Sequence, residues 1–232
     1  MCMKKLIALF TICAALSVHA EKANYWWNGS WWAKSTSGIE NIVVDEDQVT
    51  FTLLSGICIG DADGDCNTSA NKPYPSLRNQ LQSKYGEKNN RPVTHTFSVK
   101  KENMHGTSLR LWELKPFGGR TETVPTLNID SEWIGIKWAN EHNEDHSYYQ
   151  DYDLEPGVWN NFVIETLQTP FENGYVRVIL NGKLVFDYDG PTSYSHHFPN
   201  QIWIGPYICC GYPEDEPNHV VSYKNITPKY VH

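Results

Sequence analysis

The sequence of 232 residues carries 27 acidic and 19 basic side chains, so its net charge is −8 at neutral pH. Nucleic acid is excluded as a partner, because binding to phosphates requires a basic surface. Hydrophobic residues make up 40% of the chain, and neither a repeat nor a low-complexity linker divides it, so we expect a single domain with an ample core.

Residues 1–20 have the organisation of a secretory signal peptide. Two lysines precede an apolar run over residues 6–16, and cleavage is expected after Ala20. The run is too short to span a membrane. Its removal takes away both lysines and leaves 17 basic against 27 acidic residues, a net charge of −10. We therefore expect a secreted monomer, extracellular or periplasmic, with a mature domain over residues 21–232 and no membrane contact after cleavage.

The mature N-terminal segment is dense in tryptophan, with Trp26, Trp27, Trp31 and Trp32 close together. Indole rings offer a stacking surface for sugar rings. They also carry a large apolar area and are mostly buried in β-sandwiches. Packing in the core or along a sheet edge is the favoured interpretation for at least half of them.

Strand-like runs recur along the chain, separated by clusters of Gly, Pro, Asn and Asp. They predict strands at residues 41–44, 49–54, 78–82, 94–100, 108–115, 133–138 and 161–167. No segment shows a sustained helical period, so the expected class is all-β. The regular spacing of turns favours a β-sandwich or jelly roll.

An acidic loop between the second and third predicted strands is a candidate calcium site. Asp61, Asp63 and Asp65 alternate there around Gly64, and clustered carboxylates suit hard cations such as Ca²⁺. The spacing is not that of an EF-hand, and an ordinary Asp/Gly/Asn turn is the alternative. No other cofactor is expected.

Four cysteines remain after signal cleavage, and they allow three pairings: Cys58, Cys66, Cys209 and Cys210. A Cys58–Cys66 bridge would leave two adjacent cysteines to form a strained vicinal bond or to stay free. Either crossed pairing avoids that strain and would tie the acidic loop to the segment after Tyr207, so crossed pairing is favoured.

The stretch over residues 157–207 contains the strongest local signal. Two runs of alternating pattern, residues 176–180 and 184–188, flank Asn181-Gly182. This pair predicts a two-residue hairpin turn, because both central residues of such a turn need positive φ. A Gly-Pro-Thr exit and a third strand ending in Gly-Pro-Tyr follow.

This order of motifs resembles a known family. A strand beginning G-x-W, a strand leading into N-G-K, an exit G-P-T-x-Y and a closing G-x-Y strand are similar to the C-terminal half of polysaccharide-lyase jelly rolls. These concanavalin-like β-sandwiches include heparin, glucuronan and alginate lyases, and the resemblance covers roughly the last two thirds of the chain. It implies a concanavalin-like fold and cleavage of an acidic, uronic-acid-containing glycan by β-elimination.

Such a reaction has three requirements. The uronate carboxylate must be neutralised by hydrogen-bond donors or a cation, because charge grows on it as the C5 proton leaves. A base must remove that proton, and an acid must protonate the departing O4. On one sheet face these groups sit at positions i and i+2 of a strand.

Two predicted strands have that pattern. Arg78 and Gln80 share one face, and they resemble the Arg-x-Glu-Leu strand of alginate-lyase relatives, with Gln80 in place of the acid. Glu113 and Lys115 share a face with Leu111, and they stand where those enzymes carry Gln-x-His. The resemblance implies that Arg78 and Gln80 hold the carboxylate and that Glu113 contacts substrate. Polar side chains that merely fill an exposed sheet face are the alternative for this set.

The remaining candidates complete the site that the resemblance implies. Tyr207 matches the family's acid or base tyrosine, and Arg110 and Tyr194 are candidate substrate-binding residues. The family's histidine is missing, so Lys115 with a depressed pKa, or His95 if it points into the same cleft, would take the second proton. The rival to a lyase is a non-catalytic carbohydrate-binding jelly roll, either lectin-like or a degenerate lyase.

Overall fold

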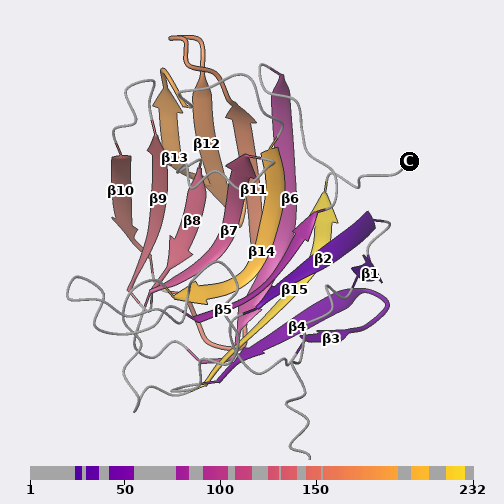
Figure 1. The fold of residues 1–232 in the computed structure, drawn as a ribbon. Coiled ribbons are helices and arrows are strands. Elements are labelled where there is room, and N and C mark those ends of the chain that lie inside the picture. The colour runs from indigo at the N-terminus through magenta and orange to yellow at the C-terminus, as the bar shows by residue number, and fades with distance from the viewer. Residues whose placement is uncertain are drawn as a thin grey trace, which may run out of the picture.

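Two antiparallel sheets, packed face to face, make up the described part of the chain (Figure 1). The computed structural model describes residues 24–27, 30–36, 42–54, 77–83, 91–103, 108–116, 125–130, 132–139, 145–152, 154–192, 200–208 and 218–227. Every regular element in these ranges is a strand, which confirms the all-β sandwich. These residues contain no helix that could cross a membrane.

The two sheets bring together strands that are far apart in the sequence. The eight-stranded sheet has the order β1 (Asn24–Trp27), β2 (Ser30–Thr36), β5 (Leu77–Ser83), β14 (Asn200–Ile208), β7 (Leu109–Pro116), β8 (Thr126–Ile129), β9 (Trp133–Ala139) and β10 (Asp145–Asp151). The seven-stranded sheet has the order β13 (Lys183–Asp189), β12 (Tyr175–Leu180), β11 (Asn160–Leu167), β6 (Pro92–Lys101), β15 (His219–Thr227), β4 (Gln48–Leu53) and β3 (Ile42–Val44). As a result β14 lies between β5 and β7.

The predicted hairpin is present. Asn181 and Gly182 have φ of 51° and 81°, and they join β12 to β13 with Leu180 paired to Lys183. Val176, Val178 and Leu180 point into the core, as their alternation predicts. A register shift in β13 interrupts the second run, so that Leu184 is exposed while Val185 and Phe186 are both buried.

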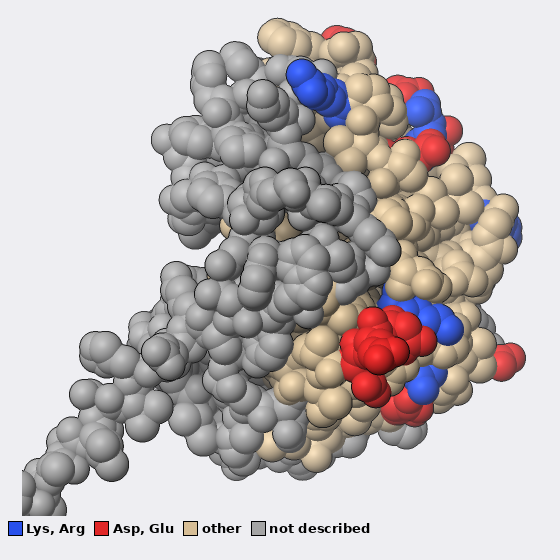
Figure 2. All heavy atoms as spheres, turned by 90° about the vertical axis from the view of Figure 1, so that its right-hand side faces the viewer, with Lys and Arg blue, Asp and Glu red and all other residues tan. Residues whose placement is uncertain are grey.

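Charged side chains of both signs lie beside one another on the described part of the face in Figure 2. One such pairing on the surface joins Arg177 of β12 to Asp187 at 2.9 Å and to Asp189 at 2.8 Å. Exposed pairs of this kind contribute little to stability. Mixed signs also differ from the basic field that nucleic acid would need.

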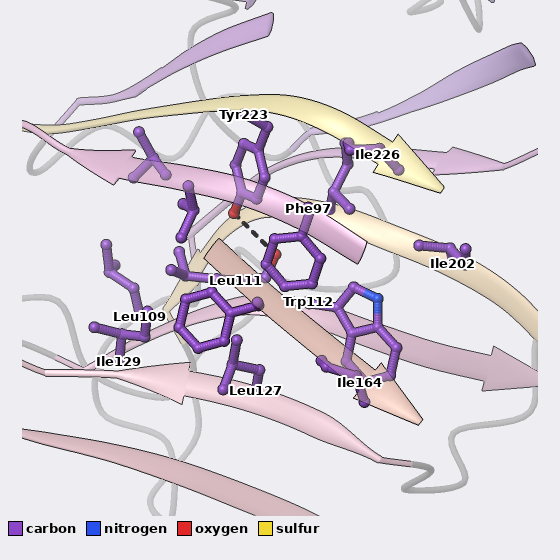
Figure 3. Packing of buried hydrophobic residues seen from close by; sticks show 14 of the residues in the cluster. Phe97, Leu109, Leu111, Trp112, Leu127, Ile129, Ile164, Ile202, Tyr223 and Ile226 are labelled. Carbon is purple, nitrogen blue, oxygen red and sulfur yellow. Dashed lines mark hydrogen bonds between the residues drawn. The ribbon is translucent and has the colours of Figure 1, made fainter. Parts of the chain in front are cut away.

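The core is filled by the inward residues of both sheets (Figure 3). Phe97 of β6 stacks on Phe162 of β11, with ring centroids 5.4 Å apart. The hydroxyl of Tyr223 donates to the carbonyl of Leu111 at 2.9 Å and so links the two sheets. Burial raises the pKa of Tyr223, and the hydroxyl therefore stays protonated as a donor.

Two of the four N-terminal tryptophans are packed in the core rather than displayed. Trp27 and Trp32 are buried, and the Trp32 indole donates to the Trp27 carbonyl at 3.2 Å. This is the packing expected for at least half of the four. The side chains of Trp26 and Trp31 lie outside the described part.

Candidate active site

The pairing of β14 with β5 and β7 gathers the predicted site residues on one face. Tyr207 pairs with Arg78 on one side and with Arg110 on the other. Leu81, Trp112 and Ile204 alternate with these residues and are buried in the core, so the intervening side chains point to the outer face of the sheet. We call this set the Tyr207 cluster: Arg78, Gln80, Arg110, Glu113, Lys115, Trp203 and Tyr207.

A bulge in β7 decides which of its side chains reach the cluster. The register with β8 shifts between Arg110 and Trp112, and Leu111 lies among the core residues (Figure 3). The expectation that Leu111 shares a face with Glu113 and Lys115 is therefore wrong. The extra residue turns Arg110 onto their face instead, and its Nη1 lies 3.1 Å from Glu113 Oε1.

Three cations surround the two aromatic rings of β14. The Arg78 guanidinium lies 4.7 Å from the centroid of the Tyr207 ring and 5.3 Å from that of Trp203. The Arg110 guanidinium is 5.0 Å from the Tyr207 centroid. Lys115 Nζ is 4.2 Å from the Trp203 centroid and 6.0 Å from that of Tyr207. Ring faces attract cations, so this packing holds the positive groups close together.

Glu113 is fully buried among these cations, and Lys115 Nζ lies 3.0 Å from its Oε2. Burial alone would raise the pKa of Glu113, but Arg110, Lys115 and Arg78 outweigh it and hold the pKa below its usual range. Burial lowers the pKa of Lys115, with Arg78 and Arg110 acting in the same direction, and the Glu113 carboxylate only partly offsets this. Three cations and one carboxylate give the cluster a local charge of +2 in a chain of charge −8.

Gly205 lets β14 lie close to β5 between the two aromatic rings. Its φ is 115°, and a Cβ there would come 2.4 Å from the Asn79 carbonyl oxygen and 3.0 Å from Gln80 Cα. The amide of Gln80, which is fully buried, donates to the Gly205 carbonyl at 3.3 Å. A residue without a side chain is therefore needed at the centre of the cluster.

His95 does not join the cluster. It lies on β6 of the opposite sheet, where it shares the inward face with the core residues Phe97 and Val99. It is 1% exposed, and its ring contacts Trp112 edge to face at a centroid distance of 5.2 Å. Of the two positions that the sequence left open for His95, in the cleft or packed in its strand, the structure shows the packed one, because its place in the strand directs it between the sheets.

Other predictions lie outside the described residues. These are the roles of Tyr194, the calcium site at Asp61, Asp63 and Asp65, and the pairing of Cys58, Cys66, Cys209 and Cys210. Within the described ranges, no group of three or more His, Cys, Asp or Glu side chains could hold a metal ion.

Sequence reasoning missed Trp203. This residue is 8% exposed, and its ring contacts both Lys115 and Arg78. The sequence pattern could have predicted its position. Trp203, Gly205 and Tyr207 occupy alternate positions of one strand, so their side chains share a face.

Comparisons with solved structures place the fold. A glucuronan lyase from the fungus Trichoderma reesei aligns with a TM-score of 0.60 at 10% identity, over 90% of this chain and 90% of that chain. An alginate lyase from Pseudomonas aeruginosa aligns at 0.56 and 12% identity, over 80% and 84% of the two chains. Botulinum neurotoxin type C, whose cell entry depends on two ganglioside molecules, aligns at 0.54 and 10% identity, over 84% and 42%.

Sequence comparison adds nothing further, since no family model and no curated protein matches the chain. At identities this low, the structural likeness establishes the fold alone. That fold is the jelly roll of the β-sandwich polysaccharide lyases, which confirms the fold expected from the sequence.

Proposed function

We propose that this protein is a secreted polysaccharide lyase that cleaves a uronic-acid-containing glycan by β-elimination. The observation that carries the proposal is the convergence of Arg78, Lys115 and Tyr207 around one point of the outer sheet face. If polar residues merely filled a solvated sheet face, three cations would not be expected to pack against the rings of Trp203 and Tyr207. Active sites, in contrast, are where burial and neighbouring charges are combined to shift pKa values.

The cations supply the first requirement of the reaction, which is neutralisation of the substrate carboxylate. Arg78 and Arg110 flank the Tyr207 ring, and a guanidinium can bind a carboxylate with two parallel hydrogen bonds. Gln80 Oε1 and Trp203 Nε1 are buried and have no hydrogen-bond partner among the described residues. Unpaired buried polar atoms are costly, so the cluster retains unused hydrogen-bonding capacity beside the three cations.

Lys115 and Tyr207 supply the two proton transfers. Neutral Lys115 takes the C5 proton, the electron pair of that C–H bond forms the C4–C5 double bond, and the C4–O4 bond breaks. The Tyr207 hydroxyl gives its proton to O4, and solvent returns both groups to their starting protonation. The lowered pKa of Lys115 makes this role feasible, since a base must lose its proton near the working pH.

The test is incubation of the full chain with alginate, glucuronan, heparin and pectate. Each cleavage leaves an unsaturated uronate whose ultraviolet absorbance is followed over time. We expect absorbance to rise with at least one polymer and to stay flat with a Lys115→Met variant of equal thermal stability. A folded wild-type protein that is silent on all four polymers would count against lyase activity.

The second candidate is a carbohydrate-binding jelly roll without catalysis. It is favoured by the absence of an imidazole from the Tyr207 cluster. Among the described histidines, His95 and His219 lie buried in the other sheet, and His146 of β10 stacks on Trp138. Under this alternative the protein binds one of the same polymers in titration calorimetry and produces no absorbance. Binding without product selects this function over the lyase.

A further inference from the structure

A second aromatic feature lies on the same sheet face as the Tyr207 cluster, and no residue of it belongs to that cluster. Trp133 of β9 and Tyr149 of β10 meet edge to face, with ring centroids 4.9 Å apart and planes at 86°. Tyr149 is 51% exposed. We call these two residues the Trp133–Tyr149 platform.

Gly135 allows both rings to lie over the sheet. A Cβ at this glycine would come 2.8 Å from an atom of the Trp133 ring and 2.9 Å from two atoms of the Tyr149 ring. Cβ contacts this short do not occur unless the neighbour moves. The rings therefore occupy the space that a side chain at position 135 would fill.

Strand register connects the platform to the proposed active site. A single row of directly paired residues crosses six strands, from β5 to β10: Arg78, Tyr207, Arg110, Asn128, Gly135 and Tyr149. Neighbouring strands are about 4.8 Å apart, so the platform lies roughly 14 Å from Arg110 along this row. That distance is longer than one sugar unit, so a single ring cannot touch both places.

The chemistry of the platform differs from that of the cluster. Lys137, Ser147 and Asp151 are the nearest charged or polar positions on this face of β9 and β10, and they place one charge of each sign beside the rings. Such a surface does not select for a carboxylate. It suits the apolar C–H face of a sugar ring, which packs on aromatic side chains.

We propose that the Trp133–Tyr149 platform is a distal binding subsite for a second sugar unit of the polysaccharide that the Tyr207 cluster binds. This inference rests on the proposed function for the identity of the ligand. The cluster selects an acidic sugar by charge, and the platform selects chain length, because only an oligosaccharide long enough to follow the row reaches both.

The test compares Tyr149→Ala with Tyr148→Ala. Tyr148 is the neighbouring residue of β10 and is 41% exposed, but it points to the opposite side, where its ring contacts Phe186 at 5.0 Å. Affinity is measured by titration calorimetry with disaccharides and hexasaccharides of alginate, glucuronan and cellulose. KM and kcat are measured with the hexasaccharides wherever the wild-type protein is active.

For Tyr149→Ala we expect about tenfold weaker binding of the hexasaccharide, the usual scale for truncation of an exposed aromatic contact. Disaccharide affinity and kcat stay unchanged, and Tyr148→Ala binds both lengths like the wild type. Gly135→Ala, whose added methyl group displaces both rings, reproduces the loss for the hexasaccharide.

Equal hexasaccharide affinity in Tyr149→Ala and the wild type overturns the platform even if the lyase assay is positive. Weaker binding of both the disaccharide and the hexasaccharide to Tyr149→Ala also overturns the platform, because Tyr149 would then affect binding at the Tyr207 cluster. If the neutral cellulose hexasaccharide binds through Tyr149 and no polymer is cleaved, the platform stands and the lyase function fails. A protein that binds none of the three sugars overturns the platform, and the lyase function is then decided by the assay with the four polymers.

Discussion

Tyr207 is enclosed by Arg78, Arg110 and Lys115, and its ring holds these cations regardless of its hydroxyl. Tyr207→Phe therefore removes the proton that the proposed mechanism delivers to O4 and leaves the packing in place. We expect kcat to fall about a hundredfold or more, the usual contribution of a general acid, with KM and Tm close to those of the wild type. Steady-state kinetics measures kcat and KM, and thermal unfolding measures Tm.

Tyr175→Phe is a matched control, because Tyr175 also carries a cation over its ring, Arg177 at 4.6 Å, but lies on the other sheet. It should leave kcat unaltered. A Tyr207→Phe variant with kcat within twofold of the wild type would remove the tyrosine from the mechanism and move acid catalysis to another group.

Glu113 sets the pH range in which Lys115 can act as a base. Its carboxylate raises the pKa of Lys115 against burial and the neighbouring arginines. Glu113→Gln removes that influence, so the pKa of Lys115 falls further and the neutral amine forms at lower pH. We expect the rising limb of the kcat/KM profile against pH to move toward lower pH. An unmoved limb would show that Lys115 is not the base.

The same substitution has a stability signature. Because the pKa of folded Glu113 lies below its usual value of 4.5, its contribution to stability is present above that pH and is lost as the pH falls through the folded pKa. Glu113→Gln should cost about 3 kcal/mol at neutral pH, since it leaves buried cations unpaired. Its stability should also change less on acidification than that of the wild type. Denaturant unfolding at several pH values, with Glu165→Gln on β11 as control, measures this.

The sequence predicts this site only where alternation is unbroken. Arg78 and Gln80 lie two positions apart on a regular strand, and their shared face follows from the pattern. Arg110 and Glu113 lie three positions apart, and only a bulge puts them on one face. A bulge depends on pairing with β8, which local pattern does not encode. For His95 the pattern left the direction of the side chain open, because a polar residue at an inward position of a strand looks like an exposed one.

At the level of secondary structure, the cluster depends on how closely β14 approaches β5. Gly205→Ala puts a methyl group against the Asn79 carbonyl at a φ of 115°, which non-glycine residues avoid. We expect a loss of about 3 kcal/mol in unfolding free energy and a fall in activity greater than the loss of folded protein explains, because Trp203 and Tyr207 flank this position. Denaturant unfolding and kcat/KM measure the two effects.

The matched variant is Gly182→Ala in the β12–β13 turn. Its φ is 81°, also positive, but a Cβ there meets nothing within 4 Å. It should cost only about 1 kcal/mol, the backbone penalty alone, and leave activity unchanged. Equal losses in the two glycine variants would refute the role assigned to close packing at Gly205.

Strands were predictable where one face is buried and turns are well marked. The Asn181-Gly182 hairpin is such a case, since its positive φ values and inward valines follow directly from local sequence. β10 was not predicted, because it is an edge strand whose residues Ser147, Tyr148 and Tyr149 are all exposed. Its pattern carries no alternation, and only pairing with β9 makes it a strand. The order of strands in each sheet was likewise not encoded locally.

For the whole molecule, the proposed function has to reconcile two charges. The chain carries −8 overall and −10 after signal cleavage, and the Tyr207 cluster carries +2 with Lys115 protonated and +1 with Lys115 neutral. A polyanionic substrate is repelled by the first and attracted by the second, so the distance over which each charge acts decides the outcome. That distance is the Debye length, about 30 Å at 0.01 M salt, 8 Å at 0.15 M and 3 Å at 1 M.

These lengths predict that cleavage of an acidic glycan is fastest at intermediate ionic strength. At about 0.01 M salt the substrate experiences the repulsion of the whole acidic chain, and near 1 M even the cluster is screened. At about 0.15 M the distant acidic groups are screened while the cluster still attracts. The measurement is kcat/KM for the preferred polymer across this range, with Tm recorded at each salt concentration. A steady fall with added salt, as for a protein whose whole surface attracts the polymer, would contradict this balance and would mean that the acidic surface lies too far from the bound chain to matter.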